Sequence, residues 1–314
     1  MAPRKTKVDL SALTTEQTNP LARELDTKSA LEIARIINAE DAKVAPAVQR
    51  VLPQIATAID WVAHALRNGG RLIYVGAGTS GRIAALDAAE CPPTFNTTPT
   101  MVQFVIAGGA KALAGATEAD EDSQALGVRE MKRKRASKED VVVGLAASGR
   151  TPFTVAAVKC ARSTGARTIA ITCNGGTPLA KAAELAIVVD TGPEVIAGST
   201  RMKAGTAEKM VLNIISTGAM VRLGYVYGNL MVNLHRKNSK LAERSIGIVE
   251  QALGFPDRDA LSALRSAGYS VPLAIVMSKA EVKRSIALQA LTRAQGHVRN
   301  AITLAKKMRD QGRK

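Results

Sequence analysis

Glycine and hydroxyl residues gather at one point of the chain in a pattern suited to binding a phosphate. The segment Gly76-Ala-Gly-Thr-Ser-Gly81 follows the short apolar run 71–75 and precedes the Ala-rich, helix-like stretch 82–90. Small residues there let backbone N–H groups approach an anion, and the N-terminus of a helix favours negative charge. Thr79 and Ser80 add hydroxyl donors. The spacing therefore predicts an anion-binding loop between a strand and a helix.

The G-x-G-x-x-G spacing of this loop also occurs in dinucleotide-binding sites. Such a site needs an acidic residue about 20 positions further on, where it binds the ribose hydroxyls. No Asp or Glu occurs between Cys91 and Thr117. The sequence therefore argues against NAD and leaves the phosphate interpretation.

A second junction, Ala147-Ser-Gly-Arg-Thr151, repeats this chemistry after the third expected strand. Ser80 and Ser148 have a simpler interpretation, in which each only caps its own helix. However, two similar junctions at the carboxyl ends of parallel strands lie where open α/β sheets bind ligands. The pair therefore favours one phosphorylated ligand bound by both loops.

Glu90 is a candidate general acid. The sequence predicts that its helix ends there, because Cys91 precedes Pro92 and Pro93, and a residue before proline resists helical geometry. A carboxylate at a helix C-terminus faces the negative end of the dipole, which favours its protonated form.

A group of carboxylates further along the chain is a candidate for the general base. Four acidic side chains occupy five positions: Glu118, Asp120, Glu121 and Asp122. Mutual repulsion raises the proton affinity of at least one of them, as a base working near neutral pH requires. The alternative is a solvated acidic turn, and the cluster by itself does not identify which acid matters.

The elements that must position these groups form an alternating pattern. Short apolar runs, several of them followed by Gly or Ser and a helical stretch, predict five strands at 71–75, 101–107, 140–147, 167–173 and 185–190. Strands alternating with helices predict an α/β fold with a parallel sheet covered on both faces. Apolar spacing near 3.6 residues predicts two helices before the first strand, at 29–38 and 44–66.

The C-terminal part reads differently. Met202–Leu223 is a long apolar-rich helix followed by Gly224, a common stop signal. Beyond about residue 240 the pattern predicts short helices without strands, at 246–253, 259–267, 272–279 and 281–295. We therefore expect a sheet domain over residues 1–240 and a small helical domain over 241–314.

Composition excludes several classes of protein. The 314 residues are 46% hydrophobic and 22% charged, which is typical of a globular chain with a sizeable core. Nine aromatic residues are too few to stack against successive bases of a nucleic acid. Neither a signal peptide nor an apolar run of membrane-spanning length occurs, so we expect a cytoplasmic protein that binds no membrane.

The charge and the metal-ligand residues have plain interpretations. The net charge is +16, and the basic excess is unevenly placed along the chain. We expect three basic runs to be solvated tails and a surface loop rather than a specific nucleic-acid site: Arg4, Lys5 and Lys7; Lys132, Arg133, Lys134, Arg135 and Lys138; and Lys306, Lys307, Arg309, Arg313 and Lys314. Three cysteines without C-x-x-C spacing and three scattered histidines make no zinc pattern, so we expect reduced thiols and no metal.

Longer motifs carry a more specific resemblance. They are Gly76-Ala-Gly-Thr-Ser-Gly-Arg82, Leu86-Asp-Ala-Ala-Glu-Cys-Pro-Pro-Thr-Phe95, Ala147-Ser-Gly-Arg-Thr-Pro152 and Gly198-Ser-Thr-Arg-Met-Lys-Ala-Gly-Thr-Ala207. Together they resemble the N-acetylmuramic acid 6-phosphate etherases over nearly the whole chain. The resemblance implies the sugar isomerase (SIS) fold, a five-stranded parallel sheet flanked by helices with a small helical C-terminal domain, and a homodimer.

The resemblance also implies an activity in the recycling of cell-wall sugars. N-acetylmuramic acid 6-phosphate would be converted to N-acetylglucosamine 6-phosphate and D-lactate without metal, nucleotide or other cofactor. Glu90 matches the family's acid and Glu121 its second catalytic glutamate, which would be the base. The implied substrate-binding residues lie in three of the motifs: Gly78, Thr79, Ser80, Ser148, Gly149, Thr151, Ser199 and Lys203.

Two positions depart from the family pattern. Asn96 stands where Gly is usual, and Asn233 stands where Asp is common. Asparagine tolerates left-handed backbone, so the first change is compatible with the same turn. The second removes a charge and leaves the role of that position open.

Two other functions fit the fold. A sugar-phosphate isomerase also needs a base beside an aldehyde, and a non-catalytic sugar-phosphate sensor needs only the binding loops. A sensor that regulates transcription would need a DNA-binding module, and no helix-turn-helix pattern precedes Arg71. The presence of both glutamates favours the enzyme.

Overall fold

A computed structural model describes residues 13–115, 118–234, 239–254 and 256–311. The chain divides into two compact units, one of Met1–Ala88 with Thr100–Ser216 and the other of Ala89–Pro99 with Thr217–Lys314. The division falls within two long helices, α4 (Gly78–Phe95) and α9 (Lys203–Arg222). This division describes compact units and does not test the domain boundary expected between residues 240 and 241. That boundary stays a prediction.

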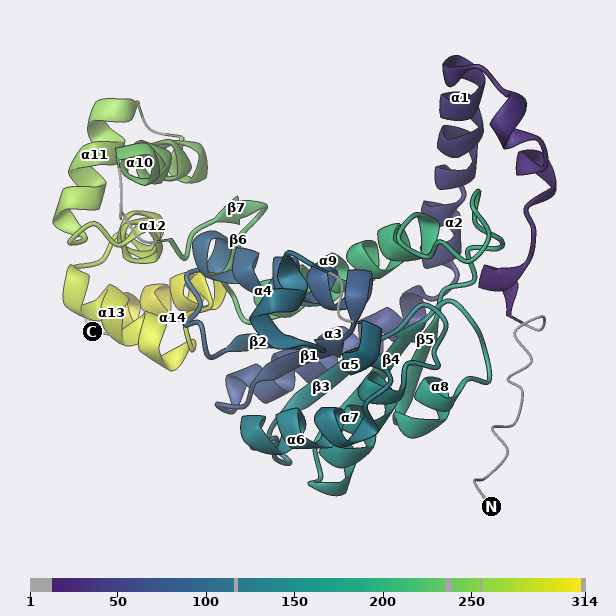
Figure 1. The fold of residues 1–314 in the computed structure, drawn as a ribbon. Helices are drawn as coiled ribbons and strands as arrows, with labels where there is room; N and C mark the ends of the chain where they lie inside the picture. Colours follow the sequence, from purple (N-terminus) through teal and green to yellow (C-terminus); the bar gives the residue numbers. More distant parts are fainter. Residues whose placement is uncertain (1–12, 116–117, 235–238, 255, 312–314) are drawn as a thin grey trace. The chain divides into compact units, whose positions relative to one another are not determined.

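The first unit is built on a parallel sheet of five strands in the order β2-β1-β3-β4-β5 (Figure 1). The strands are β1 (Leu72–Gly76), β2 (Val102–Ile106), β3 (Val141–Leu145), β4 (Arg167–Thr172) and β5 (Leu185–Val188). The α/β class and all five predicted strands are confirmed. Because the strand order reverses between β1 and β3, the loops that leave these two strands flank the point where such sheets bind ligands.

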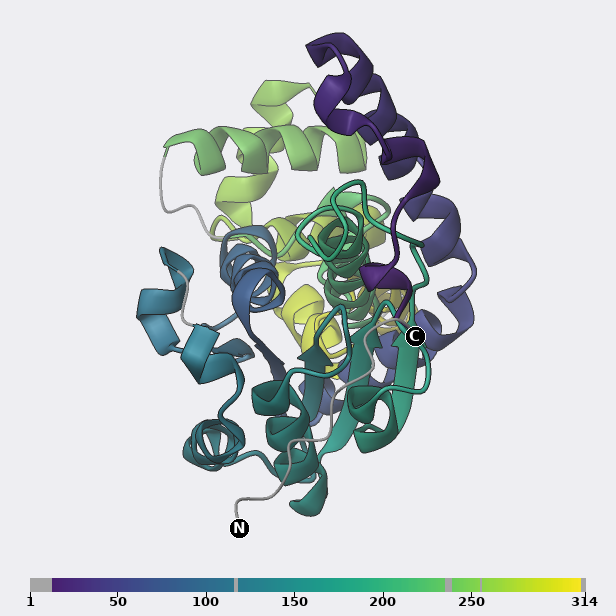
Figure 2. The same cartoon turned by 45° about the vertical axis from the view of Figure 1, so that its right-hand side comes forward.

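Helices cover both faces of this sheet. Alternate residues of β1 and β3, including Ile73, Val75 and Val142, pack with Phe153 and Val158 of α7 (Pro152–Ser163). That face also carries α6 (Gln124–Lys134) and α8 (Pro178–Ala182), whereas α3 (Leu52–Arg67) covers the opposite face (Figures 1 and 2). Burial on both faces explains why the strands are continuous apolar runs.

The N-terminal helices were predicted only in part. Helix α1 (Ala30–Asp41) begins as expected, with Ser29 and Glu32 forming a capping box. The single helix predicted at 44–66 is wrong, because the chain forms α2 (Val44–Gln49) and then α3. Pro53 stands in the first turn of α3. Proline fits there but would clash with a preceding turn of continuous helix.

The predicted end of the helix at Glu90 is also wrong, since α4 continues to Phe95 through Pro92 and Pro93. Proline has a helical φ, but it lacks the N–H donor and its ring crowds the carbonyl four residues earlier, so Pro92 and Pro93 weaken the last turn of α4 without ending the helix. The backbone N–H of Asn96 donates to the Pro92 carbonyl at 2.9 Å, and Asn96 itself has φ of +56°. Glu90 therefore lies within the helix, and the dipole argument for its protonation loses its premise.

The second unit is mainly helical. Its helices are α10 (Ser239–Leu253), α11 (Asp257–Ser266), α12 (Val271–Ala280), α13 (Arg284–Arg293) and α14 (Val298–Gln311). They share a core of small and aliphatic side chains, among them Val249, Leu264 and Ile275. The four short helices expected here are confirmed, with α10 starting earlier than expected. Helix α14 and the hairpin of β6 (Val226–Tyr227) and β7 (Leu230–Met231) were not predicted.

The basic runs are more ordered than expected. Lys132–Lys134 form the last turn of α6 rather than a loop, a position where cations suit the helix dipole. Lys306, Lys307 and Arg309 lie on α14 rather than in a tail. Five further cations of these runs lie outside the described residues: Arg4, Lys5, Lys7, Arg313 and Lys314.

Among the described residues, no single helix is both long and apolar enough to cross a bilayer, and only the bent pair α11 and α12 reaches that length and hydropathy when its members are counted together. Short 3-10 helices complete the first unit: η1 (Thr14–Glu16), η2 (Pro20–Ala22), η3 (Leu25–Thr27) and η4 (Gly109–Leu113).

Candidate active site

The first anion loop joins β1 to α4. Helix α4 begins at Gly78, whose φ is +52°, a conformation that glycine adopts without strain. Gly78 and Thr79 are partly exposed, so ligand can reach the start of the helix. The register pairs Gly76 at the end of β1 with Leu145 at the end of β3, which makes the two anion loops neighbours.

The carboxylate of Glu121 lies directly against this loop. Glu121 ends the one-turn helix α5 (Glu118–Glu121), and its Oε1 is 2.9 Å from the place that a Cβ on Gly78 would occupy. The fold thus brings Glu121, a member of the acidic cluster, to the start of α4. A base at this position can reach a ligand whose phosphate sits on the loop.

The second anion loop is fixed by residues at the end of β4 and directly after it. The Ala147 carbonyl accepts hydrogen bonds from Thr172 Oγ1 at 3.2 Å and from Asn174 Nδ2 at 3.0 Å. Gly149 has φ of +65°, and a Cβ there would come within 2.2 Å of Thr177 Oγ1. Only glycine fits this closely packed turn.

The two hydroxyl side chains of the second loop, Ser148 and Thr151, differ in their hydrogen bonds. Ser148 Oγ accepts from the Arg150 backbone N–H at 3.3 Å, which is a turn within the loop rather than a helix cap. Thr151 is the N-cap residue of α7, yet its side chain makes no capping hydrogen bond. The simple capping interpretation therefore does not account for Ser148 or Thr151.

Ser80 is bonded inward. Its Oγ donates to Oε1 of Glu208 on α9 at 2.9 Å, and Ser80 and Glu208 are 9% and 1% exposed. Burial raises the pKa of Glu208 to about 8, although the hydrogen bond with Ser80 opposes the shift. The capping interpretation is also incomplete for Ser80, because the partner is a carboxyl group of a distant helix.

The remaining predicted substrate contacts lie at the start of α9. Ser199 is partly exposed, in the loop before the helix. Lys203 is 2% exposed, and its Nζ donates to Glu40 Oε2 at 2.5 Å. Glu194 accepts from the backbone N–H groups of Lys203 and Ala204 at 3.1 and 2.9 Å. A direct contact between Lys203 and a phosphate would require this buried ion pair to break.

Glu90 belongs to the second unit and is exposed on α4. One turn earlier, in the first unit, Asp87 anchors the same helix: it accepts from Tyr74 Oη at 2.7 Å, Asn213 Nδ2 at 2.6 Å and Ser216 Oγ at 3.1 Å. Three hydrogen bonds to one buried carboxyl fix the rotation of α4 about its axis.

The two departures from the family pattern meet at the end of α4. Asn233 Nδ2 donates to the carbonyl of Phe95 at 2.8 Å, beside the left-handed Asn96. An ionised aspartate has no hydrogen to donate to this carbonyl. His297 in the same unit packs against Gly224, and its Nδ1 is buried.

Sequence reasoning missed the residues that support the loops. They are isolated polar side chains outside any glycine-rich or acidic pattern: Glu40, Asn174, Glu194 and Glu208. Their partners lie far away in the sequence, as with Lys203 and Glu40, 163 residues apart. Glu208 alone carried a signal, because it directly follows the Gly198–Ala207 motif.

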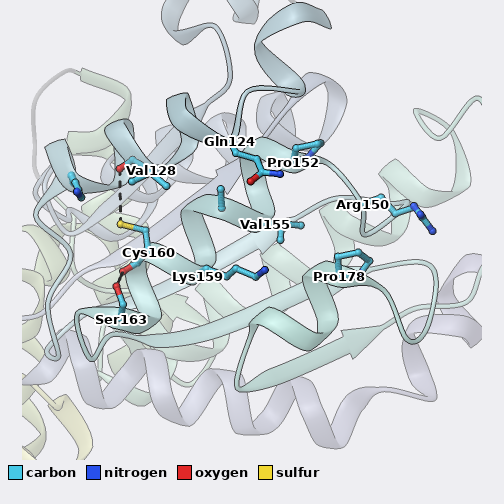
Figure 3. Close-up of a pocket in the computed structure, with 11 residues that line it drawn as sticks. Gln124, Val128, Arg150, Pro152, Val155, Lys159, Cys160, Ser163 and Pro178 are labelled. Carbon is cyan, nitrogen blue, oxygen red and sulfur yellow. Dashed lines mark hydrogen bonds between the residues drawn. The ribbon is translucent and has the colours of Figure 1, made fainter. Parts of the chain in front are cut away.

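One cavity lies beside these loops rather than over them. It holds about 610 Å³ between α6 and α7, where Gln124, Val128, Val155 and Lys159 line it (Figure 3). Arg150 of the second loop reaches its rim. Neither Glu90 nor Glu121 lines it, so this cavity does not define the site.

The fold defines a SIS-type domain. Residues 121–216 match the SIS domain, and residues 54–162 match the N-terminal SIS domain of glucokinase regulatory protein. A phosphoheptose isomerase from Francisella tularensis has the same fold at 18% identity, with a TM-score of 0.50 over 62% of this chain and 100% of that chain.

Close relatives narrow the class to one family. The N-acetylmuramic acid 6-phosphate etherase of Yersinia pestis is 49% identical over 94% of this chain and 100% of its own. Those of Klebsiella aerogenes and Bacillus licheniformis are 48% and 46% identical over 94% and 95% of this chain, and over 99% and 98% of their own. The chain belongs to the N-acetylmuramic acid 6-phosphate etherase family.

Proposed function

We propose that this chain cleaves the lactyl ether of N-acetylmuramic acid 6-phosphate, giving N-acetylglucosamine 6-phosphate and D-lactate in the recycling of cell-wall sugars. Membership of the family over nearly the whole length supports the reaction class. The structural observation that carries the proposal is the Glu121 carboxylate at the start of α4, 2.9 Å from the Cβ position of Gly78.

The phosphate is bound by the two anion loops. Backbone N–H groups around Gly78 and Gly149 and the hydroxyls of Thr79, Ser148 and Thr151 supply donors, and each charge-assisted hydrogen bond contributes about 1.5–3 kcal/mol. Ser80 and Ser199 complete this set. Lys203 has a positioning role, because its ammonium group pairs with Glu40 and so fixes the start of α9.

The two glutamates divide the proton transfers. After the sugar ring opens, Glu121 removes the proton on carbon 2, beside the aldehyde. The electron pair then expels the lactyl oxygen from carbon 3, and Glu90 protonates that oxygen as it leaves. Water then adds to carbon 3 of the unsaturated aldehyde, and carbon 2 regains a proton. The overall reaction is hydrolysis of the ether, which consumes one water and releases lactate.

The test is incubation with N-acetylmuramic acid 6-phosphate while D-lactate is assayed. We expect equal amounts of D-lactate and N-acetylglucosamine 6-phosphate. The unphosphorylated sugar serves as the control, and its kcat/KM should be lower by at least a hundredfold because it forfeits the loop contacts. Absence of lactate, or equal kcat/KM for the two sugars, would overturn the proposal.

Assembly and location are part of the same proposal. The chain acts as a cytoplasmic homodimer on a small sugar phosphate, without a membrane, specific nucleic-acid or cofactor partner. Light scattering after gel filtration measures the assembly, and a mass of one chain at assay concentration would contradict it.

A further inference from the structure

A buried carboxyl group beneath the first anion loop has no part in the proton transfers described above. Glu208 is 1% exposed, and its Oε1 lies 2.9 Å from Ser80 Oγ. Among the described residues it forms no ion pair. A buried acid without a cation is costly in its ionised form and stable in its neutral form.

In the described part of the chain, the elements packed around Glu208 offer it no compensating positive charge. Cys173 directly follows β4, and its thiol pKa is raised by burial and further by Glu208. The preceding turn of α9 carries Lys203, but that ammonium donates to Glu40. Glu194 faces the backbone N–H groups at the start of the helix. Ser80 on α4 is thus the hydrogen-bond partner that responds to the protonation of Glu208.

The direction of the Ser80–Glu208 hydrogen bond decides what Ser80 offers to a ligand. A serine hydroxyl has one hydrogen and two acceptor lone pairs. When Glu208 is ionised, that hydrogen is drawn to the carboxylate, and a phosphate above the loop meets only acceptor lone pairs. When Glu208 is protonated, its own O–H donates to Ser80 Oγ, and the serine hydrogen is released to donate to the phosphate.

We propose that Glu208 is a positioning residue that keeps a proton in order to turn the Ser80 hydroxyl toward the substrate's phosphate. The inference rests on the proposed function only in that the first loop binds a phosphate. It predicts that phosphate-dependent affinity falls once Glu208 ionises, with a midpoint near pH 8.

The test measures binding of N-acetylglucosamine 6-phosphate by calorimetry at pH 7 and pH 9, which requires no turnover. The phosphate is a dianion at both values, because its second pKa is about 6. If only the protonated form binds tightly, the competent fraction falls from about nine-tenths to about one-tenth, and Kd should rise roughly tenfold.

Matched variants separate this role from a structural one. Glu208→Gln carries an amide that donates to Ser80 at any pH, so its Kd should stay near the pH 7 value of the parent at both pH values. Ser80→Ala should bind more weakly at pH 7 and lose the pH dependence. Cys173→Ala, which changes the other titratable group facing Glu208, should keep the tenfold rise. Circular dichroism at both pH values verifies folding.

The outcomes distinguish the two proposals. If the parent binds the sugar phosphate no better than N-acetylglucosamine at pH 7, the proposed phosphate site is wrong and the inference falls with it. If the parent binds the phosphate equally well at pH 7 and pH 9, or if Glu208→Gln or Ser80→Ala retains the tenfold rise, only the role of Glu208 is refuted.

Discussion

Replacing Lys203 by methionine tests whether this residue supports the site from within the fold. The lysine is 2% exposed and its Nζ lies 2.5 Å from Glu40 Oε2, in a pair whose acid is also 2% exposed. Removing one partner of a buried ion pair typically lowers the free energy of unfolding by 3–5 kcal/mol. Lys43 still pairs with the other oxygen of Glu40, so we expect the low end of that range, about 3 kcal/mol.

The pH dependence of this loss identifies its cause. Burial raises the pKa of Glu40, but hydrogen bonds from Lys203 and Lys43 outweigh it and hold the pKa below the ordinary value. The stabilisation is therefore present above pH 4.5 and disappears as the pH falls through the folded-state pKa. The difference between parent and Lys203→Met should shrink in acid.

Thermal melts at pH 7.5 provide the assay, because 3 kcal/mol corresponds to a fall in Tm of about 6–12 °C for a unit of this size. Lys43→Met is the matched control: its side chain is 56% exposed, so solvent screens its pairing with Glu40 and we expect a smaller loss than for Lys203→Met. A Lys203→Met variant that melts within 1 °C of the parent but has a raised KM would refute this reasoning and restore a direct substrate contact.

Three further substitutions test the loops and the buried acid. Gly78→Ala places a methyl group 2.9 Å from Glu121 Oε1, at a residue whose φ is +52°. Lactate assays should therefore show kcat/KM lower by at least tenfold, and unchanged activity would contradict the placement of the base. Gly149→Ala brings a Cβ within 2.2 Å of Thr177 Oγ1, and urea unfolding should show a loss of roughly 2–4 kcal/mol, whereas a loss under 0.5 kcal/mol would mean that the turn is loosely packed. The raised pKa of Glu208 makes the folded state bind an extra proton between pH 4.5 and about 8. Over this range the parent's unfolding free energy should fall by about 1.4 kcal/mol per pH unit relative to Glu208→Gln. Parallel curves of unfolding free energy against pH for the two proteins would refute the shift.

The sheet and its loops were predictable because their signals are local. Each buried strand is a short apolar run, and each anion loop follows one with glycine and hydroxyl residues. The end of α4 was not predictable in this way. The expectation considered what Pro92 and Pro93 do to a helix, but it did not include the polar groups that complete the helix end. Asn96 and Asn233 supply that closure, and Asn233 lies 138 residues from its acceptor, the carbonyl of Phe95.

The chemistry of single charged residues was less accessible to sequence reasoning. Lys203 stands in a motif rich in small and polar residues, where a cation suggests an anionic ligand, yet its partner Glu40 lies on α1. Glu121 was one of four similar acids, and only the packing of α5 against the first loop distinguishes it. Burial decides the role of such residues, and burial is a property of the whole fold.

The division of labour between the two glutamates is tested most directly in deuterated water with N-acetylmuramic acid 6-phosphate. Deuterium at carbon 2 and release of D-lactate are measured together for Glu90→Gln and Glu121→Gln. Proton abstraction precedes departure of the lactyl oxygen, so Glu90→Gln should still exchange the carbon 2 proton while releasing almost no lactate. Glu121→Gln should lose both, by about 10²–10⁴-fold. Near-normal exchange in Glu121→Gln, or exchange lost in Glu90→Gln and kept in Glu121→Gln, would contradict the assignment.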